Sequence, residues 1–183
     1  EIHAFYTTYR GWDTMLHTMN GFLCAAIGFC LVDLFDRSEK SSLSLSPKYM
    51  AIVAFCFSMT VGVLWEFFEC AMDQLLFLDM QKDTVVNTIS TVMLDPTGGN
   101  KPQIIRGITD VILVTDQGKI SLGLGGYLDI GLLDTMKDLF VNFIGAVVFS
   151  IVGYFYVKGR GKGKFAKNFI PQVLEEPAEA EEE

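Results

Sequence analysis

Long runs without charged residues constrain the fold of this chain more than any other feature. No Asp, Glu, Lys or Arg occurs from Leu139 to Val157, from Tyr49 to Trp65, or from Thr18 to Val32. A helix of about 19 residues reaches about 28 Å, which is close to the thickness of the hydrocarbon core of a bilayer. The pattern therefore predicts three membrane-spanning helices.

A soluble domain with three buried helices is the alternative interpretation, but such helices usually keep a polar stripe, which these runs lack. We therefore expect an all-α polytopic membrane protein. Its membrane domain covers residues 1–157, with spans at about 12–35, 49–76 and 135–157. The chain begins without methionine and has no basic region before its first apolar run, so we expect a fragment that lacks upstream helices rather than a signal peptide.

Basic residues predict the orientation in the membrane. Lys and Arg gather in "VKGRGKGKFAKN", directly after the third run, and in "DRSEKSSLSLSPK", between the first two. The positive-inside rule assigns both segments to the cytoplasm. Residues 158–183 are then a cytoplasmic tail, first basic, then acidic and disordered. The acidic end supplies much of the net charge of −8, and the chain lacks the basic patch with aromatic residues that is typical of nucleic-acid binding.

The segment of about 78–133 is then extracytoplasmic, and its patterns predict structure of its own. Apolar residues recur at helical spacing in "DTVVNTISTVML" (83–94), which indicates a helix that lies on the membrane surface or covers the bundle. "DVILVTDQGKISLGL" has two β-rich runs around a turn sequence, which predicts a β-hairpin. A long ordered segment of this kind favours a lid or a binding element over a simple linker.

Polar residues step at helical spacing at one end of each predicted span. Because consecutive spans alternate in direction, these three ends lie on the same side of the membrane, and we expect their side chains to meet in an outward-facing acidic cleft. The candidate metal ligands are Asp13, Glu66, Glu69, Asp73, Asp134, Asp138 and Asn142, and the candidate catalytic residues are His17, Glu66 and Glu69.

Carboxylates joined by a single imidazole suit Mg²⁺, Mn²⁺ or Ca²⁺ better than Zn²⁺. A bound divalent cation can polarise a phosphate or ester and activate water. Alternatively, a glutamic acid with a raised pKa can act as general acid or base beside His17. The first hypothesis is thus a site that binds, or acts on, a lipid or cell-envelope headgroup, with membrane lipids as partners.

Two further hypotheses stay open. The acids can serve a proton- or cation-coupled transporter, or they can be paired structurally in a non-catalytic scaffold, with Lys137 and Arg10 as their partners. Asp134 can also be an ordinary helix cap, and Asp13 with His17 can anchor a helix at the headgroup level. GxSxG, HExxH and P-loop motifs are absent from the sequence.

The stretches "DTMLH", "WEFFECAMD" and "DTMKDLFVNFIGA" resemble the YjdF-type family of small bacterial inner-membrane proteins of unknown function, and more distantly the VanZ-like proteins linked to glycopeptide-antibiotic resistance. In that pattern an Asp and a His open one helix, paired acids lie in the next, and an Asp precedes Asn and Gly in the last. The resemblance implies a multi-span membrane protein without a settled activity. The matching residues are Asp13, His17, Glu66, Glu69, Asp134, Asp138, Asn142 and Gly145.

Overall fold

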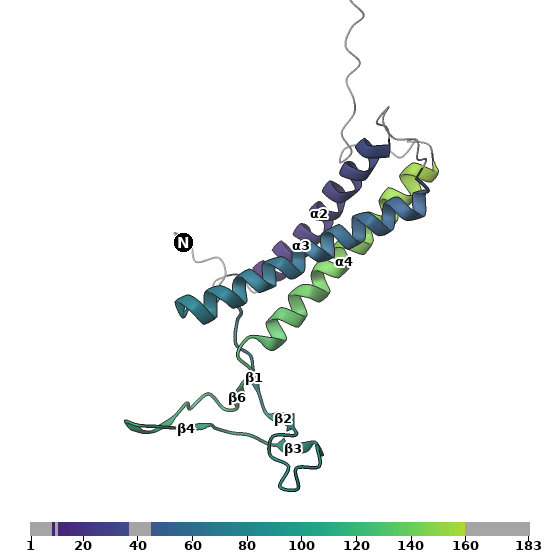
Figure 1. The fold of residues 1–183 in the computed structure, drawn as a ribbon. Helices are drawn as coiled ribbons and strands as arrows, with labels where there is room; N and C mark the ends of the chain where they lie inside the picture. Colours follow the sequence, from purple (N-terminus) through teal and green to yellow (C-terminus); the bar gives the residue numbers. More distant parts are fainter. Residues whose placement is uncertain (1–8, 10, 37–44, 160–183) are drawn as a thin grey trace, which may run out of the picture. The chain divides into compact units, whose positions relative to one another are not determined.

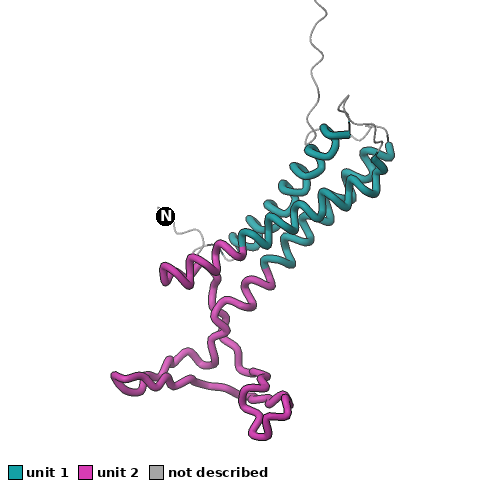
Figure 2. Tube along the Cα trace, viewed as in Figure 1, with its two compact units in different colours: residues 1–65, 138–183 teal, residues 66–137 magenta. Residues whose placement is uncertain are grey.

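The computed structural model describes residue 9 and residues 11–36 and 45–159. The chain divides into two compact units, one of residues 1–65 with 138–183 and one of residues 66–137 (Figure 2). The predicted basic loop residues Arg37 and Lys40, and the tail from residue 160 onward, lie outside the described residues.

In the described part of the chain, three helices are long and apolar enough to cross a membrane, which confirms the predicted fold class (Figure 1). They are α2 (Trp12–Asp36), α3 (Pro47–Leu76) and α4 (Leu132–Lys158). The helix α3 begins two residues before the predicted position. There the N–H of Tyr49 donates to the hydroxyl of Ser46 at 3.3 Å, and Pro47 occupies the first helical position, where its missing N–H costs nothing.

Aromatic and small side chains form the core of the first unit. Phe29 and Phe149 are fully buried, together with Ala25, Ala54 and Ala146. The ring of Phe149 packs edge-on against Phe29 at 6.1 Å between centroids. Without a hydrophobic driving force between helices in lipid, this kind of close packing is what holds a membrane bundle together.

Glycines bring the three helix backbones together around Asn142. A Cβ on Gly62 of α3 would lie 2.6 Å from the side-chain nitrogen of Asn142 on α4. A Cβ on Gly21 of α2 would overlap the backbone of the same Asn142, and one on Gly145 would overlap the backbone of Thr18. Only glycine therefore permits the observed approach of these helices.

The second unit carries three antiparallel strand pairs after the end of α3. The strands are β1 (Val85–Val86), β2 (Thr88–Thr91), β3 (Gln103–Arg106), β4 (Ile112–Thr115), β5 (Gly118–Ser121) and β6 (Tyr127–Leu128). Pairing joins β1 to β6, β2 to β3 and β4 to β5. The β4–β5 pair, with Thr115 opposite Gly118, is the hairpin that the sequence predicts.

The predicted surface helix over 83–94 is wrong, because the structure places β1 and β2 there. Short apolar runs fit both helical and strand spacing, and the β-branched residues of this segment favour strands. Pairing with strands distant in the sequence, β1 with β6 and β2 with β3, favours the strand conformation here. Asn87, between β1 and β2, donates through its side chain to the carbonyls of Ile108 and Gly125, each at 2.8 Å.

Asp129 joins this strand segment to the start of α4. Its carboxylate accepts the N–H of Thr84 at 2.7 Å and the N–H of Leu133 at 2.8 Å. The intervening Ile130 has a φ of 51°, a strained value for a β-branched residue that the surrounding contacts must hold in place. Burial alone raises the pKa of Asp129, but these donated hydrogen bonds outweigh it and hold the pKa below its ordinary value.

We expect Gly145→Ala to destabilise the protein by about 1–3 kcal/mol, because the new Cβ must push the α2 backbone away. A loss of stability is informative, because alanine stabilises a helix relative to glycine by about 1 kcal/mol where no other atoms lie near its Cβ. Thermal or SDS-induced unfolding of the purified protein in detergent measures the change. Val148→Ala, at an exposed position of the same helix, is the control and should shift stability by less than about 0.5 kcal/mol. Equal effects of the two substitutions would contradict the packing assignment.

The Asp129 contacts should depend on pH. Because the folded-state pKa is lowered, the carboxylate stabilises this junction above its ordinary pKa, and the stabilisation is lost as the pH falls through the folded-state value. Amide hydrogen exchange of Thr84 and Leu133, corrected for intrinsic rates, should therefore accelerate at acid pH. In Asp129→Asn the corrected rates should be higher at neutral pH and no longer follow this titration. A wild-type profile that matches the variant would refute the assignment.

Candidate functional site

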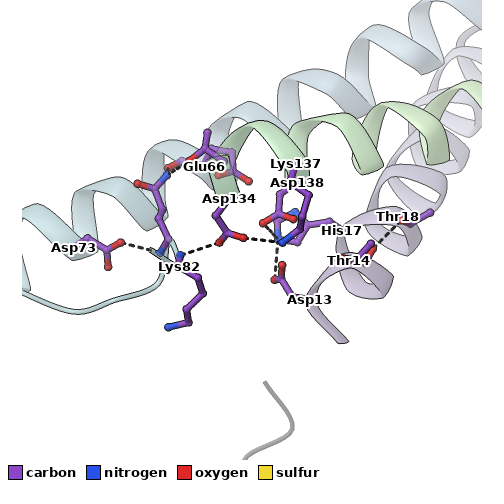
Figure 3. Close-up of polar contacts among 12 residues, drawn as sticks. Asp13, Thr14, His17, Thr18, Glu66, Asp73, Lys82, Asp134, Lys137 and Asp138 are labelled. Atoms are coloured by element: carbon purple, nitrogen blue, oxygen red, sulfur yellow. Dashed lines mark hydrogen bonds and ion pairs between the residues drawn. The ribbon is translucent and has the colours of Figure 1, made fainter. Parts of the chain in front are cut away.

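Two carboxylates face one imidazole at one end of the bundle in the first unit (Figure 3). Asp13 and His17 lie one turn apart at the start of α2, and Asp138 lies in the second turn of α4. The Nε2 atom of His17 is 3.5 Å from Oδ1 of Asp13 and 3.7 Å from Oδ2 of Asp138. The structure thus brings together three of the residues that the sequence predicts.

The packing of the next turn explains why these three side chains meet. Gly21 follows His17 by one turn of α2, and Asn142 follows Asp138 by one turn of α4. Because Gly21 allows the backbones of α2 and α4 to touch at Asn142, the residues one turn before must also approach each other. The packing of the two helices therefore accounts for the approach of these side chains.

The distances between these side chains are compatible with ligands of a shared ion. Strong hydrogen bonds between charged nitrogen and oxygen are about 2.7–2.9 Å long, whereas the two separations here are 3.5 and 3.7 Å. Two ligands held about 2.1 Å from one octahedral ion lie about 3.0 Å apart when adjacent and about 4.2 Å apart when opposite. One ligand atom from each of the three residues lies within 4.8 Å of the others.

Burial makes the charge of this cluster costly. The exposed fraction is 1% for Asp138 and 8% for His17. A carboxylate removed from water needs compensating charge or hydrogen bonds, and inside a membrane protein an ionisable residue is a candidate for a functional site.

Asn142 has a packing role that the sequence analysis did not anticipate. Its amide nitrogen lies 3.5 Å from the carbonyl oxygen of Ser58 and 3.6 Å from the sulfur of Met59, both on α3. Ser58 in turn donates its hydroxyl to the carbonyl of Gly21 at 2.7 Å. Polar contacts between helices of this kind stabilise bundles in lipid, and they account for a buried amide without a ligand.

The predicted acids of the second unit fall into two groups. Glu66 and Glu69 are buried on α3, with exposed fractions of 4% and 8%. Asp73, one turn further, closes the end of the helix, because its carboxylate accepts the N–H groups of Met80 at 2.7 Å and Gln81 at 2.8 Å. The convergence of Glu66, Glu69 and Asp73 on the cluster of the first unit stays a prediction.

Asp134 also has structural partners in the second unit. Its carboxylate accepts the N–H of Lys82 at 2.8 Å and the ammonium of Lys137 at 2.7 Å (Figure 3). It is not the cap of α4, which begins at Leu132. The pairing with Lys137 agrees with one part of the scaffold hypothesis, while Arg10, the other expected basic partner, lies outside the described residues.

Sequence reasoning missed Gln81 in this region. Its side-chain amide donates to the hydroxyl of Thr135 at 2.6 Å, and its backbone N–H donates to Asp73. It therefore ties the end of α3 to the start of α4 within the second unit. A single polar residue in a loop carries no periodic signal, so only the three-dimensional structure reveals this role.

The comparison with known protein families agrees with the membrane fold. Residues 2–159 match the family described as "Predicted membrane protein (DUF2238)". No curated protein and no solved structure matches the chain. The finer resemblance to YjdF-type and VanZ-like proteins stays a prediction. Because the match extends over most of the 183 residues, the chain belongs to this family of membrane proteins.

Proposed function

We propose that Asp13, His17 and Asp138 bind a divalent cation. The observation that carries the proposal is the approach of two carboxylates to the same imidazole nitrogen, at 3.5 and 3.7 Å, with Asp138 almost fully buried. A neutral histidine is a metal ligand through Nε2, and two carboxylates match the charge of the ion. The remaining coordination positions belong to water or substrate oxygen.

The chemistry of the three side chains favours a hard cation. Two oxygen ligands and one nitrogen ligand suit Mg²⁺ or Mn²⁺, and the absence of a cysteine from the cluster disfavours a soft metal. Glu66 and Glu69 stay the predicted additional ligands, because they are buried carboxylates. Asp73 and Asp134 are weaker candidates. Backbone N–H groups already donate to both oxygens of Asp73, and the N–H of Lys82 and the ammonium of Lys137 donate to those of Asp134.

We further propose that this site faces the outside of the cell and contacts a phosphate-bearing headgroup. Asp13 lies in the first turn of α2 and Asp138 in the second turn of α4, at the end of the spans opposite to Lys158. The positive-inside rule puts the Lys158 end in the cytoplasm. A cation at the other end then lies near headgroup depth, where it can polarise a phosphate oxygen.

Metal binding tests the first proposal. Purified protein equilibrated with Mn²⁺ and then dialysed should retain about one ion per chain, measured by elemental analysis and by electron paramagnetic resonance. Asp138→Asn and His17→Gln should each weaken binding by at least tenfold, because removing even a residue that only orients a ligand costs about 10–100-fold. Mg²⁺ should compete for the same site.

Asp116→Asn is the matched control, because Asp116 is an exposed residue in the β4–β5 turn. It should retain the ion as the wild type does. Wild-type protein that retains no more Mn²⁺ than Asp138→Asn would overturn the proposal. Circular dichroism of each variant separates loss of the ion from loss of the fold.

Headgroup contact is tested with short-chain phosphatidylglycerol in detergent. If Mn²⁺ at this site contacts the phosphate, the ³¹P resonance should broaden with Mn²⁺-loaded wild type and much less with Asp138→Asn at the same total Mn²⁺. Phosphatidylcholine is compared to separate phosphate contact from net charge. Equal broadening with both proteins would mean that the ion does not hold the headgroup, even if metal binding itself is confirmed.

A further inference from the structure

An open groove of about 510 Å³ runs between α3 and α4 in the first unit. Its walls are apolar side chains such as Ile52, Phe55, Phe143 and Ile151, and it ends at Lys48. The rings of Phe55 and Phe143 meet edge-on with centroids 5.5 Å apart. Nothing in this groove belongs to the Asp13, His17 and Asp138 cluster.

The groove has the length and direction of a segment of acyl chain. Between Lys48 and Phe55 the helix rises by about 10 Å, roughly one third of the hydrocarbon core. The wall residues stay open to the surroundings, with Ile52 60% and Ile151 52% exposed. A cylinder of hydrocarbon that enters from the Lys48 end would bury these side chains along one leaflet.

Among the described residues that line the groove, positive charge lies at the Lys48 end. Lys48 lies in the first turn of α3, where the helix dipole adds positive potential. Tyr154 also lines the groove, and the ammonium of Lys158 lies 5.6 Å from the centre of its ring. Both lysines are exposed, so they can reach the headgroup layer while their stems cover apolar surface.

We propose that this groove binds one anionic phospholipid, with an acyl chain along Ile52 and Phe55 and the phosphate between Lys48 and Lys158. The site is separate from the proposed cation site and does not depend on it. A second copy of the chain is a poorer occupant, because pairing by the same face would bring the lysines of both copies to one depth, where they repel.

Lipid retention tests this proposal with the full chain. The protein is purified in neutral detergent that contains equal amounts of phosphatidylglycerol and phosphatidylcholine with identical acyl chains, and the retained lipid is extracted and quantified. Wild-type protein should retain about one phosphatidylglycerol per chain in preference to phosphatidylcholine. Lys48→Gln and Lys158→Gln should each lower the preference for phosphatidylglycerol by about fivefold. Lys48→Arg, which keeps the positive charge, should retain the wild-type preference.

A second variant tests the apolar part of the groove. Ala51→Trp places an indole in the groove and should abolish retention without changing the charge. The matched controls are Leu31→Trp, at an exposed position of α2, and Lys119→Gln, at an exposed position of β5. Both controls should retain phosphatidylglycerol as the wild type does.

Three results would overturn the proposal. Equal retention of the two lipids would identify ordinary boundary lipid, and full retention by Ala51→Trp would exclude the groove as the site. A dimer in light scattering that Ala51→Trp dissociates, with no lipid retained by the wild type, would show that a second copy occupies the groove. Loss of Mn²⁺ by Asp138→Asn leaves all three readouts unchanged, because the two sites lie at opposite ends of the spans.

Discussion

The contact of helix backbones at Gly21 and Gly145, with the side chain of Asn142 packed against Gly62, is the constraint on which the first unit depends. Apolar side chains gain little by leaving lipid for the bundle interior, so shape and short-range packing must hold the helices. Asn142 occupies the centre of this contact and offers its amide to α3. The polar cluster one turn away is possible because the backbones are already fixed there.

The same helix packing explains how ionisable side chains, whose burial is energetically unfavourable, are accommodated in the first unit. Asp138 and His17 are buried at the end of spans that carry no charge over their middles. In the second unit, by contrast, carboxylates stabilise chain turns. Asp73, Asp129 and Asp134 each accept backbone N–H groups. Among the described residues, some acids therefore organise loops, whereas Asp138 is buried within the helix packing.

The sequence predicts the three spans because uncharged runs of this length have few alternative structures. It also predicts the β4–β5 hairpin and the meeting of Asp13, His17 and Asp138, which follow from helical spacing and alternating direction. It fails at β1 and β2, where the local pattern fits a helix and distant strands decide the structure. Nor does it distinguish Asp134, which accepts the N–H of Lys82, from a ligand, because hydrogen-bond partners 52 residues away leave no periodic trace.

The kind of neighbour at each glycine has an evolutionary consequence. A side chain at Gly62 would meet the side chain of Asn142, so a smaller residue at position 142 can make room for it. A side chain at Gly21 or Gly145 would meet backbone atoms. No substitution at another position can remove these atoms. A larger residue at position 62 can therefore be compensated by a smaller residue at position 142. At positions 21 and 145 a larger residue can be accommodated only if α2 and α4 move apart.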